Sequence, residues 1–176
     1  MPERNLSTEH GMSPAGVNLV ADLLSDLAPG EQPPPIFYQI ARLVPLPAVE
    51  LIVFDENKQV LLTQREADDP YWPGQWHIPG TVIRATDASL GSAIKRSRQA
   101  ELEGTEVTLP RLLRPDFRHM ERGSELSLVH RAKLVGEPMA GQLFPIRNLP
   151  ENIVAFHPPL VYEASFAEFG EQNTAG

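Results

Sequence analysis

Residues 75–106 read QWHIPGTVIRATDASLGSAIKRSRQAELEGTE, and this stretch decides how the fold is interpreted. It begins with an apolar, β-branched segment, turns at a proline and a glycine, and continues into a charged segment. Apolar and small side chains recur at helical spacing between residues 90 and 103, and both Asp87 and Ser89 suit an N-cap. We therefore predict a strand, a loop and then a helix over 90–103.

Predicted strands surround this stretch on both sides. Upstream, AVELIVF and VLLTQRE flank the turn DENKQ and form a predicted hairpin. Downstream, the predicted elements are strands within VTLPRLLRP, FRHME and ELSLVHRAKLVG, a strand-to-turn segment GQLFPIRNLP, and a closing helix LVYEASFAEF. Many strands with one embedded helix and one terminal helix indicate an α/β (α+β) domain.

The first 45 residues are predicted to be an arm that precedes the domain. The arm contains a tail over 1–13, a helix over 14–29 and the proline-rich linker GEQPPP. The next segment, IFYQIARLVPLP, suits a short helix or a strand equally well. Two interpretations of the arm stay open, a helix that completes the core and an element that forms a homodimer. The domain itself is predicted over 46–170, with a C-terminal tail over 171–176.

Composition excludes several classes of protein. The formal net charge of −8 disfavours general nucleic-acid binding, which needs a basic surface, but is compatible with a small phosphorylated substrate. No run is long and apolar enough to predict a membrane span, and the N-terminal residues do not suit a secretory signal. The chain has no cysteine, so disulfides and thiolate chemistry are excluded, and a cytoplasmic location is the default expectation.

The opening stretch resembles the signature of the Nudix hydrolase superfamily, G-x5-E-x7-R-E-U-x-E-E-x-G-U, in which U is aliphatic. WHIPG matches the strand end before the signature, and RSRQAELEG stands where R-E-U-x-E-E-x-G is expected, with Arg96 and Glu101 matching. The resemblance covers roughly residues 46–165. It implies an α/β/α sandwich with a mixed β-sheet and a divalent-metal-dependent hydrolase of nucleoside-diphosphate derivatives.

The sequence also departs from this signature. Ser97 and Ala100 occupy two of the three helical glutamate positions, and Thr81 replaces the second glycine. A single metal ion is therefore expected instead of two or three. The helix is most similar to that of the sugar-nucleotide branch, which includes GDP-mannose mannosyl hydrolase, although the histidine base of that branch is missing near residues 138–139.

The resemblance implies a set of metal ligands. Glu101 and a backbone carbonyl of Gly80 or Thr81 are expected to hold one Mg²⁺ or Mn²⁺, with Glu103 or Asp87 assisting. Mg²⁺ favours one or two carboxylates together with water and phosphate oxygens, so a short ligand set is sufficient. Glu101 and Glu103 are two positions apart and diverge on a continuous helix. A solvated helix end is the simpler interpretation of both glutamates.

Other residues are candidates for substrate contact or catalysis. Arg65 and Arg96 are expected to steer charge on a small nucleotide-type substrate, and Trp76 is a candidate for stacking on a base or sugar, as its neighbour Trp72 also is. His119, beside Glu121 and a predicted loop, is a candidate general base. The simpler interpretations are that the arginines are exposed surface residues, that the tryptophans pack in the core, and that the histidine is a packing residue.

Two functions follow from the sequence. The first is a Nudix-type hydrolase that uses one divalent cation on a nucleoside-diphosphate-linked substrate, with a sugar nucleotide as the specific candidate. The alternative is a catalytically inactive Nudix-fold binding or regulatory module, which the two missing glutamates favour.

Overall fold

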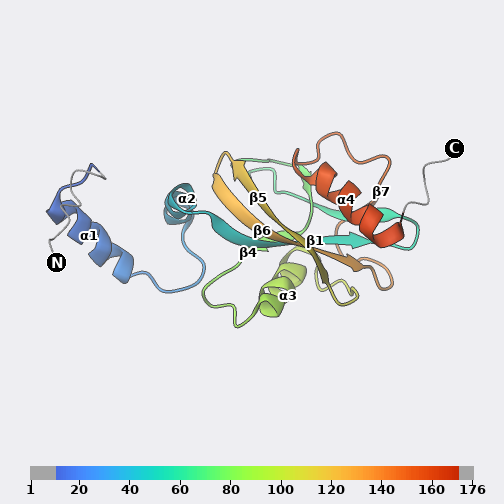
Figure 1. Ribbon diagram of the computed structural model, residues 1–176, viewed down its shortest axis with the longest axis horizontal. Coiled ribbons are helices and arrows are strands. Elements are labelled where there is room, and N and C mark those ends of the chain that lie inside the picture. The colour runs from blue at the N-terminus through green and yellow to red at the C-terminus, as the bar shows by residue number, and fades with distance from the viewer. Residues whose placement is uncertain (1–10, 171–176) are drawn as a thin grey trace.

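The computed structural model describes residues 11–170 (Figure 1). Most of the predicted N-terminal tail and the whole predicted C-terminal tail lie outside the described residues. The described chain contains helices α1 (Pro14–Ser25), α2 (Pro34–Leu43), α3 (Leu90–Glu101) and α4 (His157–Phe169). Its strands are β1 (Leu46–Phe54), β2 (Gln59–Gln64), β3 (Trp76–His77), β4 (Gly80–Val82), β5 (Arg111–Met120), β6 (Gly123–Lys133) and β7 (Gln142–Pro145).

The strands form one mixed sheet whose main path has the order β3-β2-β1-β6-β5. β1 and β6 are parallel, and every other named strand pair is antiparallel. β4 pairs with the first half of β1 and β2 pairs with its second half, so β1 changes partner along its length. Helices α3 and α4 lie on opposite sides of the sheet (Figure 1). The predicted α/β fold with a mixed sheet is confirmed.

β1 is buried on both faces, which explains its uninterrupted apolar run LIVF. Alternate side chains of a strand point to opposite faces. Ile52 and Phe54 pack in the core that α4 covers, whereas Leu51 and Val53 pack in the core that contains Leu102, just after α3. β1 is therefore the central element on which both layers of the molecule are built.

Helix α3 is shorter than predicted. It begins at the N-cap Ser89, whose side chain accepts a hydrogen bond from the backbone of Ser92 in a capping box. It ends at Glu101 because Leu102 turns inward and is fully buried, while Glu103 adopts a left-handed conformation with φ of 49°. Glu101 and Glu103 consequently do not share a helical turn.

The predicted strand over WHIPGTVI is two strands that have different partners. β3 pairs with β2, and β4 pairs with β1. Pro79 stands between them and, having no N–H, cannot donate to a ladder, although its carbonyl accepts from the backbone of Leu51 at 2.9 Å. Downstream, the two short predicted strands over 107–121 are largely one strand, β5, with a register shift between Leu112 and Arg114.

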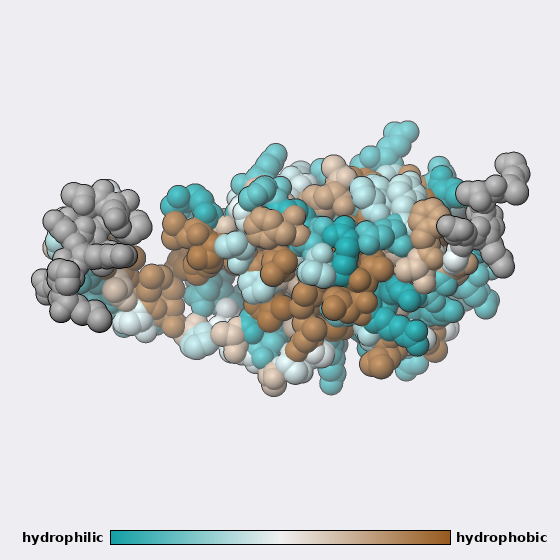
Figure 2. Space-filling model, in the orientation of Figure 1, coloured by the Kyte–Doolittle hydropathy of each residue, from teal (hydrophilic) through white to brown (hydrophobic). Residues whose placement is uncertain are grey.

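The arm contains two helices with different environments. The segment that suited helix or strand folds as α2, and its Ala41 is buried. α1 stands apart from the sheet and buries no residue, so it does not complete the core (Figure 1). Hydrophobic residues gather over α2 and the adjoining part of α1 (Figure 2). Within 11–170, no helix has the length and apolar character that a membrane span requires.

Gly123, at the turn between β5 and β6, fixes the position of α2. A Cβ atom at this position would lie 2.0 Å from the carbonyl oxygen of Ala41, and φ is 132°. Only glycine allows this close approach of two backbones. The turn and α2 are therefore held together by a steric requirement.

We predict that Gly123→Ala lowers the free energy of unfolding by about 3 kcal/mol, because the new methyl group collides with backbone atoms that a side-chain rotation cannot move. Gly136→Ala is the matched control, since Gly136 also has a positive φ, 72°, but has no atom within 4 Å of its Cβ position. Its expected cost is about 1 kcal/mol. Urea denaturation compares the two variants, and equal costs would contradict the close approach.

Candidate functional site

A cavity of about 140 Å³ opens beside the first half of β1, where β3, β4 and the end of α3 meet. The turn between β5 and β6 and the start of α4 complete its wall. Its lining contains seven groups that carry or can carry charge, namely Glu50, Arg65, His77, Glu101, Arg122, Glu125 and His157. The sequence brings these residues from six separate segments.

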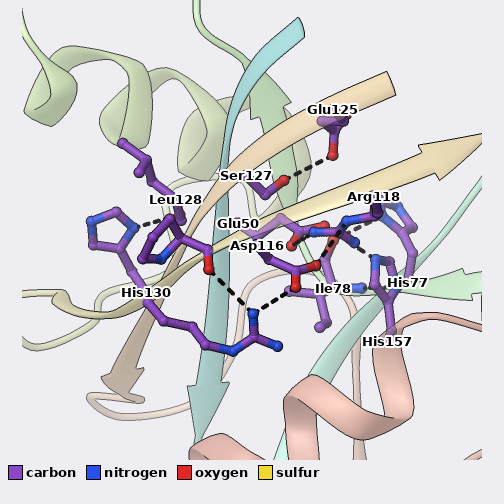
Figure 3. A network of polar contacts seen from close by, with 12 residues as sticks. Glu50, His77, Ile78, Asp116, Arg118, Glu125, Ser127, Leu128, His130 and His157 are labelled. Carbon is purple, nitrogen blue, oxygen red and sulfur yellow. Dashed lines mark hydrogen bonds and ion pairs between the residues drawn. The ribbon is translucent and has the colours of Figure 1, made fainter. Parts of the chain in front are cut away.

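Glu50 is a buried carboxylate at the floor of this cavity. Its Oε2 accepts a hydrogen bond from Arg118 Nη2 at 2.5 Å, and its Oε1 lies 3.3 Å from His157 Nε2 (Figure 3). Burial alone would raise the pKa of Glu50, but the hydrogen bond of His157 and the charge of Arg118 lower it to about 2. Glu50 is therefore ionised, and its charge is already neutralised by Arg118.

The tautomer of His157 follows from its two contacts. The backbone N–H of Ile78 donates to Nδ1 at 3.1 Å, so the ring proton resides on Nε2 and is donated to Glu50. Burial lowers the pKa of His157 despite the neighbouring carboxylate, and the imidazole is neutral at neutral pH. With both nitrogens engaged, His157 orients Glu50 and joins α4 to β1.

Glu101, the last residue of α3, is the carboxylate whose charge is not balanced. Its Oε2 accepts from Thr63 Oγ1 at 3.2 Å, and it receives a backbone hydrogen bond from Gly80. Burial outweighs these bonds and raises the pKa of Glu101 to about 7. Among the described residues no lysine or arginine forms an ion pair with it, so the site holds a carboxylate that a cation would stabilise.

The backbone of Gly80 faces the same side as Glu101. Leu51 N donates to Pro79 O and Ile83 N donates to Pro47 O, which fixes the alternation of the β1–β4 ladder. In that alternation Thr81 exchanges its backbone bonds with β1, whereas Gly80 directs its N–H and C=O away from β1. Of the two carbonyls expected as metal ligands, only that of Gly80 is free of the ladder.

The oxygen donors of the cavity that are not already paired would suit a single divalent cation. Glu125, the third carboxylate of the cavity, forms an ion pair with Arg122 and accepts from Ser127 Oγ, as Glu50 is paired with Arg118. Across 11–170 no set of three His, Asp or Glu side chains is arranged to hold a metal. Glu101 and the Gly80 carbonyl leave most positions to water and substrate oxygens, which suits Mg²⁺.

A short hydrogen-bonded chain connects Glu101 to His77. Thr63 Oγ1 lies 3.2 Å from Glu101 Oε2 and 3.0 Å from His77 Nε2. His77 Nδ1 lies 2.9 Å from the carbonyl of Ile78 and so donates to it, which leaves Nε2 as an acceptor. Burial lowers the pKa of His77 to about 3. The single hydroxyl proton of Thr63 can therefore be given to the carboxylate or to the imidazole, but not to both.

Asp87 and Arg96, predicted as metal ligand and substrate contact, form a brace outside the cavity lining. Arg96 donates to Asp87 from Nε at 3.1 Å and from Nη2 at 2.6 Å, and also to Thr81 Oγ1 and the Val82 carbonyl. The hydrogen bonds from Arg96 lower the pKa of Asp87 to about 2. Both side chains are occupied in joining α3 to β4.

Three further candidates also lie outside the cavity lining. Glu103 follows the end of α3 in a left-handed turn. His119 Nδ1 lies 2.8 Å from Ser124 Oγ across the β5–β6 hairpin, and its ring packs on Phe117. Trp76 packs edge-to-face on Phe144 in the core. The structure thus brings Gly80, Thr81, Glu101 and Arg65 together in the cavity wall and separates the other predicted residues from it.

Sequence reasoning missed Glu50, Arg122 and Glu125. Glu50 had a usable signal, since it is the lone charge in the apolar strand AVELIVF. An ionised side chain in a doubly buried strand requires a partner, and partners of that kind cluster at functional sites. Arg122 and Glu125 lie at a hairpin turn, where charged residues are ordinary, so their pattern carried no signal.

Known structures resemble this fold. A MutT NUDIX hydrolase from Burkholderia pseudomallei is 20% identical, with a TM-score of 0.56 over 68% of this chain and 97% of that one. The NUDIX domain of NrtR from Shewanella oneidensis, in complex with ADP ribose, is 18% identical, with a TM-score of 0.56 over 84% and 97%. A NUDIX hydrolase from Nitrosomonas europaea is 13% identical, with a TM-score of 0.57 over 71% and 90%.

No curated protein matches this sequence. The family model of the NUDIX domain does match it, over residues 44–163, which include β1, the cavity wall and the first part of α4. That match covers well over half of the chain. The chain therefore belongs to the NUDIX family.

Proposed function

We propose that this protein is a NUDIX hydrolase that cleaves a nucleoside-diphosphate-linked substrate with a single divalent cation, Mg²⁺ or Mn²⁺. The observation that carries the proposal is Glu101, a largely buried carboxylate without a cation partner, beside the ladder-free carbonyl of Gly80. A bound cation would neutralise charge on the substrate diphosphate. The same ion would balance Glu101.

The residues of the cavity divide the remaining tasks. Glu50 is ionised, paired with Arg118 and hydrogen-bonded by His157, so it fixes the geometry of the cavity floor. Arg65, in the cavity wall, supplies a positive charge for a phosphate oxygen. Arg96 does not reach the cavity wall and acts by bracing α3 against β4, which positions Glu101.

Two observations support the substrate class. The cavity combines cationic side chains with an unbalanced carboxylate, which suits a diphosphate that arrives with a divalent cation. The NUDIX domain of NrtR, similar in fold, was crystallised with ADP ribose, a nucleoside diphosphate linked to a sugar. A sugar nucleotide, as the sequence of the α3 region indicates, belongs to the same chemical class.

We predict that Glu101→Gln lowers kcat/KM by at least about 100-fold, because the amide cannot balance a cation in the cavity. The assay presents ADP-ribose, GDP-mannose, a dinucleoside diphosphate and a nucleoside triphosphate with Mg²⁺ or Mn²⁺. Detection of phosphate, diphosphate and free sugar identifies the bond that is cleaved.

Glu103→Gln is the matched control, since it makes the same chemical change two residues away and outside the cavity lining. It should retain the wild-type rate, and EDTA should abolish turnover by the wild type. Binding of these compounds without turnover would contradict the proposal, as would equal activity of Glu101→Gln and the wild type.

We predict a pH-dependent effect of Glu101→Gln on stability without metal. The pKa of Glu101 is about 7 in the folded state against the ordinary 4.5. Between these two pH values Glu101 holds a proton in the folded state but not in the unfolded state, so the free energy of unfolding falls as pH rises. Above pH 7 Glu101 is ionised in both states, and the full destabilisation by its buried charge remains. In EDTA at about pH 8, Glu101→Gln should be more stable than the wild type by about 2 kcal/mol.

Urea denaturation at about pH 8 and about pH 4.5 measures this difference, which should disappear at the lower value. Glu103→Gln should match the wild type at both. A Glu101→Gln variant that is less stable than the wild type at about pH 8 would show that Glu101 is a structural residue.

A further inference from the structure

Two arginines of the cavity wall share one aromatic ring. The guanidinium carbon of Arg65 lies 5.1 Å from the centroid of the Trp72 ring, and that of Arg122 lies 5.6 Å from it. Cation–π attraction favours each contact, yet the two positive charges repel one another. An arrangement that keeps like charges together is more favourable when an anion is bound between or beside them.

Asp69 connects Arg65 to the loop that carries Trp72. Asp69 Oδ2 accepts from Arg65 Nη1 at 3.0 Å, while Asp69 Oδ1 accepts from the backbone N–H groups of Tyr71 and Trp72 at 2.9 and 2.8 Å. Burial opposes ionisation, but these hydrogen bonds and the charge of Arg65 keep the pKa of Asp69 below its ordinary value. One carboxylate therefore orients both the ring and the first arginine.

The arm holds the second arginine. Arg122 forms an ion pair with Glu125, and its guanidinium carbon lies 5.9 Å from the centroid of the Phe37 ring in α2. Gly123, the next residue, meets the backbone of Ala41 in the same helix. α2 lies outside residues 44–163, so this support comes from a segment that the NUDIX match does not include.

Each guanidinium keeps donors available. Arg65 uses Nη1 and Arg122 uses Nη2 for their carboxylates, and the two Nε atoms are buried without an acceptor. Within the described part of the chain, Arg65 Nη2 and Arg122 Nη1 have no acceptor and are not among the buried unpaired atoms. These N–H groups are free to donate to a ligand in the cavity that both residues line.

We propose that Arg65 and Arg122, seated on Trp72, form a two-arginine clamp for the diphosphate of the substrate, with α2 as the support of Arg122. This inference deepens the proposed function and rests on it for the identity of the substrate. The planar guanidinium suits phosphate oxygens, to which it donates in pairs. Glu101 lines the same cavity, so the clamp and the metal site address one diphosphate.

The test measures binding of inorganic pyrophosphate by isothermal titration calorimetry, with Mg²⁺ and separately with EDTA. Arg122→Gln should weaken binding by about tenfold or more in both conditions, because a charge-assisted hydrogen bond is lost. Arg65→Gln should weaken binding by a similar factor in both conditions. Arg147→Gln, which removes an equal charge from an exposed position outside the cavity lining, is the matched control and should change binding by less than about twofold.

Two further variants keep the test decisive if Arg122→Gln leaves Glu125 unpaired and unfolds. Arg122→Lys preserves the ion pair but removes the planar fork, and about threefold weaker binding is expected. Phe37→Leu touches no ligand atom and should weaken binding by a similar factor through the loss of the support. Folded Arg122→Lys and Phe37→Leu proteins that bind pyrophosphate as the wild type does would overturn the clamp.

Glu101→Gln separates this inference from the proposed function. It should weaken pyrophosphate binding with Mg²⁺ and leave binding in EDTA unchanged or stronger, since the removed charge repels the anion. If the arginine variants lose affinity but no compound is hydrolysed, the clamp stands and the hydrolase proposal fails. If hydrolysis is normal in Arg122→Gln, the clamp fails and the hydrolase proposal stands.

Discussion

The buried ion pair between Glu50 and Arg118 is the constraint on which the arrangement of this molecule depends. A carboxylate in the central strand is costly to bury, and breaking such a pair leaves an uncompensated charge that costs several kcal/mol. Satisfying Glu50 fixes where Arg118 of β5 and His157 of α4 must lie. One side chain thereby aligns three elements that are distant in sequence, and the cavity is formed where they converge.

The sequence predicted the parts of the fold that depend on local patterns. The apolar run of β1 and the periodic residues of α3 show such patterns, and the structure confirms the predicted strand and the predicted helix. The end of α3 and the division at Pro79 depend on tertiary contacts, namely the burial of Leu102 and the partner change of β1. Gly80, Glu101 and Arg65, which line the cavity, were candidates from the sequence because they lie in or near one motif. Arg118 and Arg122 were not candidates, because their contacts exist only once β5 packs beside β6.

One position at which this chain lacks a glutamate of the family signature is buried in the packing of α3. Ser97, at a position where the signature has a glutamate, is only 3% exposed, and its Oγ has no partner among the described residues. A glutamate there would add a longer, charged side chain to a closely packed contact between α3 and the sheet. The helix thus provides close packing at Ser97 and places a single carboxylate, that of Glu101, in the cavity wall.

The positions of the two tryptophans have an optical consequence. The chain contains only Trp72 and Trp76, four residues apart, yet Trp72 lines the cavity under two guanidinium groups while Trp76 packs on Phe144 in the core. Indole emission responds to nearby charge and to solvent. In a Trp76→Phe protein the remaining signal therefore reports on occupancy of the cavity, and in a Trp72→Phe protein it reports on integrity of the core. The chain carries one intrinsic probe for the cavity and another for the core.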